Sequence, residues 1–431
     1  MIITKFFKMN WIKNKDKLKL FATSGLNQMI SSGTNFLINL YLISVFSPNS
    51  FGIYGIGFAI VLFIGGLGNS FFLTQMVVIY PLKNQDKRDD FVINVLNLII
   101  VFCGILFLLI IPISLLNNFI LVDYLFSKTL IPAIIFASVM YLLKEFFVRT
   151  AYNDRKEFIA IYIHSSILIT VVLLYVLARV LIKELDISIA FTIYGVSHLA
   201  GVFVGAYLLK IKPVFTLRKE LIIVLKELWV DGKWATITNV VYMLRSQTHI
   251  IIALLIIGTV AVGNMNAARL FITPAVMIIP VISQLALPRL SKLREINKLD
   301  MFKKGRWLTV VYLSFGLVYS SVLLSSYEIV ISNFVNESYG DLFVLTLLWC
   351  IYAIILAIRN SQDIIAQVLR KFKKLTVINF LSAIITLIAS YFLAKTFGLN
   401  GVLIGMIIGE LFLILMLFFI LKKENINSYL C

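Results

Sequence analysis

Long apolar stretches, separated by short groups of polar residues, dominate the pattern of the chain. A helix that spans a bilayer needs about 20 mostly apolar residues. The pattern therefore predicts an all-α integral membrane protein with about 12 transmembrane helices, within a range of ten to fourteen. The twelve stretches are 20–46, 51–80, 91–116, 120–143, 158–182, 187–209, 232–257, 261–287, 306–331, 341–369, 375–397 and 401–421.

The composition supports a membrane protein and excludes several other classes. Of the 431 residues, 60% are hydrophobic and 14% are charged, whereas soluble domains are roughly a quarter charged. Soluble enzymes and nucleic-acid-binding proteins are therefore disfavoured, in spite of a net charge of +18. Of the three cysteines, Cys103 and Cys350 lie in apolar stretches and Cys431 is the last residue, so they predict neither a disulfide framework nor a metal site.

The distribution of cations predicts the topology. With the N-terminus inside, 32 of the 39 Lys and Arg residues fall in inner segments and four in outer ones. Because Lys and Arg are retained on the cytoplasmic side, this alternation supports both the span count and cytoplasmic N- and C-termini. We expect a multi-pass protein of the bacterial cytoplasmic (inner) membrane.

All predicted loops are short, so we expect function to lie within the membrane. The longest inner loop, 210–231, is the natural linker between an N-terminal lobe, 1–209, and a C-terminal lobe, 232–431. Each lobe would hold six spans.

An internal repeat supports this division. The first span carries Gln28, Ser32, Asn35 and Asn39 on one helix face, and the seventh carries Thr238, Tyr242, Arg245 and His249 at the same spacing. Shortly afterwards Phe51-Gly52 corresponds to Val262-Gly263. Two six-span halves in the same orientation, as in some transporters, explain this pattern.

Three arginines, Arg245, Arg269 and Arg359, lie inside predicted spans. An arginine at the centre of a span costs roughly 2.5–3.5 kcal/mol, so it must face protein or water. Arg245 has no acidic residue within one helical turn, which favours a cation that faces a cavity; snorkelling or pairing with Glu410 is the alternative. Arg359 stands four residues before Asp363 and can simply pair with it.

Other polar residues in the spans have structural explanations of comparable weight. We expect His249 to be a hydrogen-bonded bundle residue rather than a proton carrier. Glu410 follows Gly401, Gly405 and Gly409, a spacing that indicates close helix packing. Lys144 and Glu145 are adjacent at an inner helix end, where we expect the headgroup boundary.

The absence of several motifs disfavours some classes of function. The sequence has no phosphate-binding Gly-x-x-x-x-Gly-Lys-Ser/Thr loop and no His-Glu-x-x-His metal pair. The first outer loop has no carboxylate and no outer loop is large, which disfavours sugar transferases and polymerases. We expect no cofactor, no metal and no catalytic residue.

Two segments carry motifs of a known family. The first is Ser47-Pro48-Asn49-Ser50-Phe51-Gly52-Ile53-Tyr54-Gly55, which resembles the junction between the first two spans of the MOP transporter superfamily. The region from Gly258 to Arg269, with Pro274 and then Leu287-Pro288-Arg289, is similar to its seventh and eighth spans. Length, basic charge and small loops resemble the polysaccharide branch, the Wzx-type O-antigen or capsule repeat-unit flippases.

The resemblance implies two six-helix lobes in a V shape and alternating access around a hydrophilic central cavity. It implies a cargo of polyprenyl-diphosphate-linked oligosaccharide, with membrane lipids and, as candidate partners, the polymerase and chain-length proteins. Candidate substrate-binding residues are Arg245, Arg269, Arg359, Tyr242, His249, Gln28, Ser32, Asn35 and Asn39, and candidate coupling residues are Asp363 and Glu410.

Two alternatives stay open. A multidrug/cation antiporter of the same superfamily would need an intramembrane carboxylate in the first lobe, and its predicted spans show none away from their ends. A membrane-embedded sugar transferase would need carboxylates in the first outer loop, which has none.

Overall fold

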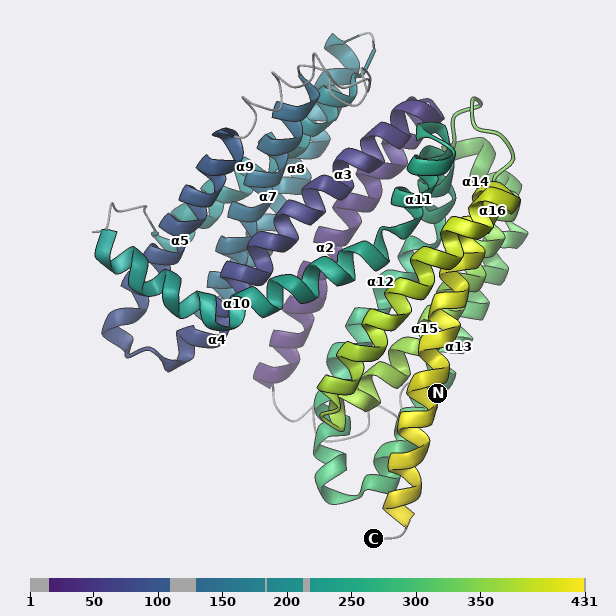
Figure 1. Cartoon of the computed structure of the whole chain (residues 1–431). Helices are drawn as coiled ribbons and strands as arrows, with labels where there is room; N and C mark the ends of the chain where they lie inside the picture. Colours follow the sequence, from purple (N-terminus) through teal and green to yellow (C-terminus); the bar gives the residue numbers. More distant parts are fainter. Residues whose placement is uncertain (1–14, 109–128, 183, 212–217, 430–431) are drawn as a thin grey trace. The chain divides into compact units, whose positions relative to one another are not determined.

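The computed structural model describes residues 15–108, 129–182, 184–211 and 218–429, and in these ranges the regular structure is helical (Figure 1). The N-terminal tail and the junction of the third and fourth predicted spans lie outside the described residues. The helices of the first half are α2 (Lys15–Val45), α3 (Pro48–Gly68), the π-helix η1 (Asn69–Leu73), α4 (Thr74–Ile79), the 3₁₀ turn η2 (Tyr80–Leu82), α5 (Gln85–Leu108), α7 (Leu130–Asn153), α8 (Glu157–Leu181) and α9 (Ile187–Leu209). Those of the second half are α10 (Arg218–Ser246), α11 (Thr248–Ile256), α12 (Thr259–Ile296), α13 (Lys298–Ser325), α14 (Tyr327–Phe334), α15 (Phe343–Val368) and α16 (Phe372–Tyr429).

The fold class predicted from the sequence is confirmed: the described part is all-α and rich in membrane-length helices. Within the described ranges, nine helices are long and apolar enough to cross a membrane, or ten if the bent pair α10–α11 is one span. The twelve predicted stretches differ from this number because α2 is not among the nine and α16 contains two predicted spans. The chain is therefore a multi-pass membrane protein.

The chain divides into two compact units. Unit 1 comprises 1–35 and 57–239, and unit 2 comprises 36–56 and 240–431. Figure 1 shows α7, α8 and α9 packed together in unit 1, and α12, α13, α15 and α16 side by side in unit 2. These units differ from the predicted lobes in two respects. The junction of α2 and α3 belongs to unit 2, and the predicted linker, 210–231, belongs to unit 1.

The α2–α3 junction is a capped turn. Ser47 lies before α3 and its Oγ accepts a hydrogen bond of 3.3 Å from the amide of Ser50, which satisfies one of the free donors of the helix start. Pro48 occupies the first position of α3, where its missing N–H is harmless. The Ser-Pro sequence thus both ends the first predicted span and begins the second.

Reciprocal contacts between two glycines explain why this junction belongs to unit 2. A Cβ atom at Gly52 of α3 would overlap the carbonyl oxygen of Thr259, and one at Gly263 of α12 would overlap that of Pro48. The separation between Pro48 and Thr259 along the sequence equals that between Gly52 and Gly263. The two halves of the contact are therefore related by an approximate two-fold axis. This symmetry supports the internal repeat predicted from the sequence.

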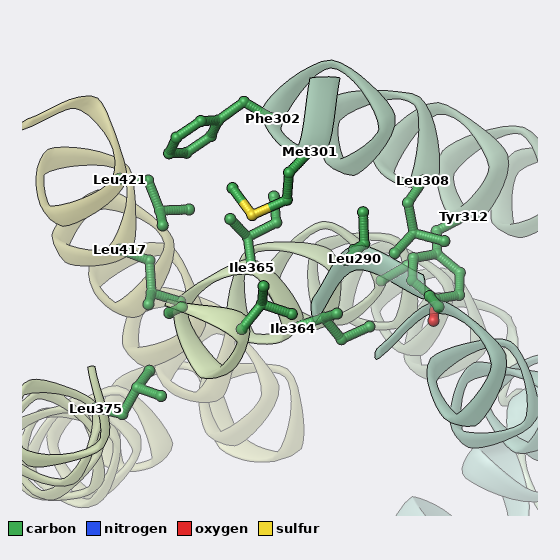
Figure 2. Packing of buried hydrophobic residues seen from close by; sticks show 14 of the residues in the cluster. Leu290, Met301, Phe302, Leu308, Tyr312, Ile364, Ile365, Leu375, Leu417 and Leu421 are labelled. Carbon is green, nitrogen blue, oxygen red and sulfur yellow. The ribbon is translucent and has the colours of Figure 1, made fainter. Parts of the chain in front are cut away.

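One apolar cluster in unit 2 joins α12, α13, α15 and α16 (Figure 2). Met301, Leu413 and Leu417 are fully buried there, and Phe302 and Ile365 pack beside them. In a bilayer, such packing rather than the hydrophobic effect holds helices together. The cluster fixes α15 between its neighbours, and α15 carries much of the site described below.

A break in α16 separates the last two predicted spans. Gly398 has φ 57° and ψ −135°, a conformation that other residues rarely adopt. After the break, a Cβ at Gly401, Gly405 or Gly409 would overlap atoms of the preceding segment, at Leu393, Ser390 and Thr386 respectively. The close helix packing predicted from the Gly-x-x-x-Gly-x-x-x-Gly run is confirmed.

Unit 1 buries the pair of charges, Lys144 and Glu145, that the sequence analysis placed at the inner end of a helix. Lys144 is 2% exposed, and its Nζ lies 2.5 Å from Oε1 of Glu145. The expectation that these residues stand at a helix end was wrong, because α7 continues for about two more turns to Asn153 and packs against α8 and α9 around this pair.

Candidate functional site

A polar cavity of about 250 Å³ lies inside unit 2. Its walls come from four helices: the last turn of α10, the middle of α12, α15 and the second half of α16. The lining residues are Tyr242, Arg245, Ser246, Arg269, Ile272, Thr273, Val276, Ile279, Pro280, Trp349, Tyr352, Ala353, Leu356, Arg359, Asn360, Met406 and Glu410. All three arginines predicted to lie within the membrane, together with Tyr242 and Glu410, therefore meet in one cavity.

Arg245 is held by a neutral partner. It lies in the last turn of α10 and is 8% exposed. One Nη donates a hydrogen bond of 2.9 Å to Oδ1 of Asn379, whose own Nδ2 donates to the carbonyl of Leu375. The helix C-terminus stabilises the cation through the helix dipole. The guanidinium is therefore oriented without being neutralised.

The position of Arg245 depends on a break in the seventh predicted span. Gln247 leaves helical geometry at φ −103° and ψ 12°, which ends α10 and starts α11. The hydroxyl of Thr248 donates to the carbonyls of Leu244 and Arg245, at 2.9 and 3.0 Å. A break inside a membrane is tolerated where side chains satisfy the freed carbonyls and the segment lines a cavity.

Arg269 is also held by neutral groups. One Nη donates to Nε2 of His249 at 3.1 Å, and the guanidinium lies 5.6 Å from the centre of the Trp349 ring. Such a cation–π contact stabilises a desolvated guanidinium. His249, which is fully buried, thus acts as a bundle residue that orients Arg269, and it does not line the cavity itself.

Arg359 is in a different situation, because two carboxylates bind it. It pairs with Asp363 one turn later on α15, and its Nε lies 2.8 Å from Oε2 of Glu410 on α16. The hydroxyl of Tyr352 also approaches Glu410, at 3.4 Å. Glu410 is therefore the partner of Arg359 and not, as the alternative from the sequence had it, of Arg245.

These contacts give the cavity an uneven charge. The Arg359 network has one cation and two carboxylates. Within the described residues, no carboxylate forms an ion pair with Arg245 or Arg269. The cavity therefore presents two oriented cations on α10 and α12, in addition to Arg359 and Glu410, which belong to a network with excess negative charge on α15 and α16.

The predicted polar residues of α2 are divided between the units. Gln28, Ser32 and Asn35 belong to unit 1, and Asn39 belongs to unit 2. Gln28 donates a hydrogen bond of 2.8 Å to Ser32, one turn further along α2. None of the four lines the cavity of unit 2, and their role in binding stays a prediction.

The sequence reasoning missed Trp349, Tyr352, Asn360 and Asn379. The first three share one face of α15 with Arg359 and Asp363, at spacings of three, four and seven residues. The periodicity used for the first and seventh spans would have found this face. Asn379 could not have been found in that way, because only the packing of α16 brings it to Arg245.

Removing Arg359 is expected to destabilise the protein strongly. Arg359→Met leaves two buried carboxylates without a counter-charge, and breaking a buried pair in this way costs about 3–5 kcal/mol. We expect a clearly lower melting temperature of the purified protein in detergent.

The matched control removes the charges together. The triple variant Arg359→Met, Asp363→Asn, Glu410→Gln leaves no uncompensated charge, so it should recover most of the lost melting temperature. A triple variant less stable than Arg359→Met alone would contradict the network described here.

No group of three His, Cys, Asp or Glu side chains is arranged to hold a metal ion within the described ranges. The lining of the cavity offers guanidinium, amide and hydroxyl groups, which recognise a ligand by charge and hydrogen bonding. Arginines in a partly enclosed and largely apolar space bind planar oxyanions well, because their forked donors match carboxylate and phosphate oxygens.

Comparison with known proteins identifies the fold. No family model matches the chain, and no curated protein sequence matches it. Among solved structures, an inward-facing multidrug resistance MATE family transporter of the MOP superfamily aligns with a TM-score of 0.76 at 12% identity, over 93% of this chain and 95% of that one. The lipid II flippase MurJ in an inward closed conformation aligns with a TM-score of 0.73 at 16% identity, over 95% and 91%.

A third solved structure is a MOP superfamily transporter from Pyrococcus furiosus, described as having a binding pocket of reversed polarity. It aligns with a TM-score of 0.62 at 13% identity, over 96% of both chains. The chain therefore has the fold of MOP superfamily transporters over nearly its full length. At these identities the likeness shows the fold and leaves the cargo to be argued from the cavity.

Proposed function

We propose that this protein is a flippase that moves polyprenyl-diphosphate-linked oligosaccharide repeat units, of O-antigen or of a capsular or exopolysaccharide, to the outer leaflet by alternating access. The observation that carries the proposal is the pair of oriented cations, Arg245 and Arg269, in the unit 2 cavity. The likeness to a lipid II flippase supports a lipid-linked cargo.

The cavity suits the charged part of such a cargo. Its volume of about 250 Å³ is below the roughly 300–1,000 Å³ of pockets that enclose a whole drug-sized ligand. It therefore suits one group of a larger molecule, and a diphosphate is the group that two arginines recognise best. Tyr242, which is 55% exposed, would donate to a sugar hydroxyl beside it.

The residues of the cavity also argue against both alternative functions. An antiporter of the multidrug-extrusion branch shares the fold, but cationic drugs would meet two cations in this cavity. A sugar transferase would need acid–base residues at the site, and Glu410, the carboxylate that lines the cavity, is engaged by Arg359.

Several further expectations belong to this proposal. The lobes would be 1–209 and 232–431, with Gln28, Ser32, Asn35 and Asn39 contributing sugar contacts. The protein would lie in the bacterial inner membrane with both termini in the cytoplasm, beside the polymerase and chain-length proteins. Asp363 and Glu410 remain candidates for coupling, because they are the two carboxylates that pair with Arg359.

Deleting the gene tests the proposal against both alternatives. A flippase deletion should accumulate complete lipid-linked repeat units on the cytoplasmic side, detected by mass spectrometry of the polyprenyl diphosphate fraction. Deletion of a transferase would leave shortened lipid-linked units. Loss of a drug exporter would change neither the amount nor the length of the lipid-linked units. Complete units at wild-type levels, or shortened ones, would refute the flippase assignment.

A further inference from the structure

Each of the two oriented cations in the unit 2 cavity has a hydroxyl side chain beside it. Thr273 stands one turn after Arg269 on α12, and residues four apart share one face of a helix. Ser246 directly follows Arg245 at the end of α10. All four residues line the cavity, so the arginines and the two hydroxyl residues border the same space.

Both hydroxyls have already used their only hydrogen. Oγ1 of Thr273 donates to the carbonyl of Arg269 at 3.0 Å, and Oγ of Ser246 donates to the carbonyl of Met243 at 3.2 Å. A hydroxyl has one hydrogen to donate and two lone pairs that accept. These side chains can therefore still accept a hydrogen bond, and the ligand group that they recognise is a donor.

The hydroxyls thus complement a group that the arginines do not. A guanidinium only donates hydrogen bonds, and an ionised diphosphate only accepts them. The diphosphate therefore pairs with the arginines and has no hydrogen to give to Ser246 or Thr273. An isoprenyl chain has no donor either. The cavity suits a ligand that carries hydrogen-bond donors immediately beside its anionic group.

The first sugar of a lipid-linked saccharide has this combination of groups. Its anomeric carbon is bonded to the diphosphate, and the next ring carbons, C2 and C3, carry hydroxyl or acetamido groups whose O–H or N–H donates. Tyr242 stands one turn before Ser246, lines the cavity and is 55% exposed. Its ring offers an apolar face to the C–H groups of a pyranose, and its hydroxyl offers a polar contact at the edge.

We propose that Tyr242, Ser246 and Thr273 form a subsite that recognises the first sugar of the cargo by the hydrogen-bond donors on C2 and C3. This subsite rests on the proposed function, because the sugar lies beside a diphosphate held by Arg245 and Arg269. It adds selection by the sugar to binding of the charged group. Carrier lipid that bears a saccharide is therefore bound in preference to carrier lipid that bears none.

The affinities of three short-chain probes for the full-length protein in lipid nanodiscs test the subsite. The probes are farnesyl diphosphate, farnesyl glucosyl diphosphate, and the 2-deoxy-2-fluoro analogue of the latter, whose fluorine is close to a hydroxyl in size but donates no hydrogen bond. We expect the glucosyl probe to bind about 3- to 10-fold more tightly than either of the others, the range that one neutral hydrogen bond provides. Arg245→Ala gives the blank for partitioning into the lipid.

Substitutions of the two hydroxyls connect this preference to the proposed residues. In the double variant Ser246→Ala, Thr273→Val, the glucosyl and fluorinated probes should bind equally well, because neither finds an acceptor. The exchanged variant Ser246→Thr, Thr273→Ser keeps both acceptors and should keep the preference. If the double variant does not fold, the two single variants are measured instead, and at least one should reduce the difference between the probes.

Unit 1 offers a matched control for the loss of the two hydroxyls. Ser166 and Thr192 donate to carbonyls of their own helices, three and four residues earlier, each at 2.8 Å. They make the same kind of backbone hydrogen bond as Ser246 and Thr273, and they do not line the cavity. Ser166→Ala, Thr192→Val should therefore keep the preference for the glucosyl probe.

The subsite is refuted if the wild-type protein binds the glucosyl and fluorinated probes equally, or if the preference survives the loss of both hydroxyls. In that case an affinity for farnesyl diphosphate above the Arg245→Ala blank would retain the cation site of the proposed flippase. Failure of the proposed function has a different result, because none of the three probes would then bind more tightly to the wild-type protein than to Arg245→Ala.

Discussion

Replacing Arg245 with alanine is expected to reduce transport of a polyprenyl-diphosphate oligosaccharide by about 10- to 100-fold, because each charge-assisted hydrogen bond is worth roughly 1.5–3 kcal/mol. The loss should appear in proteoliposomes loaded with a fluorescent cargo. Arg245→Lys should restore part of the activity, since it keeps the charge but loses the fork of donors.

Two further variants separate binding from folding. Arg306 is an exposed arginine of α13 outside the cavity, so Arg306→Ala should transport normally. Asn379→Asp keeps Arg245 in place but pairs it with a carboxylate at the position of the 2.9 Å hydrogen bond, so it should also lose transport. If Arg245→Ala and Arg245→Lys both transport at the wild-type rate, with equal protein in the membrane, Arg245 does not bind the diphosphate.

The second large effect concerns the crossing of α3 and α12. Gly263→Ala adds a single methyl group, but that group overlaps the backbone carbonyl of Pro48, which cannot move away as a side chain could. Overpacking costs about 1–3 kcal/mol or more, so we expect a strongly reduced melting temperature and little folded protein. Size-exclusion chromatography and thermal unfolding in detergent measure both.

The reciprocal geometry supplies the controls. Gly52→Ala should act in the same way, and the double variant should cost less than the sum of the two, because both methyl groups force the same helices apart. Gly104, inside α5, has open space at its Cβ, so Gly104→Ala should be neutral or slightly stabilising. Equal stability of Gly263→Ala and Gly104→Ala would show that the two helices do not meet at Gly263.

The helix positions could be predicted from the sequence because they depend on local properties. The apolar stretches match the helices, and the Ser47-Pro48 turn begins α3 as expected. The glycines after Gly398 could be interpreted in advance, since small residues at a spacing of four allow close packing whatever the partner. The burial of Lys144 could not be predicted, because α8 and α9 pack around it and no local pattern describes that packing.

The candidate site was only partly predictable. Arg245, Arg269 and Arg359 could be recognised because an arginine in an apolar stretch is conspicuous in any context. Their partners could not be recognised from the sequence, because they are distant along the chain: Glu410 stands 51 positions from Arg359, and Asn379 is 134 positions from Arg245. Only the packing of α16 against α11 and α15 decides which carboxylate neutralises which cation.

The sequence by itself determined that this is a multi-pass helical membrane protein with three costly cations in its spans, because hydropathy and charge act residue by residue. The tertiary structure decided the charge of the cavity. Two carboxylates meet at Arg359 and leave Arg245 and Arg269 with neutral partners, because ion pairing depends on distances of a few ångströms between helices.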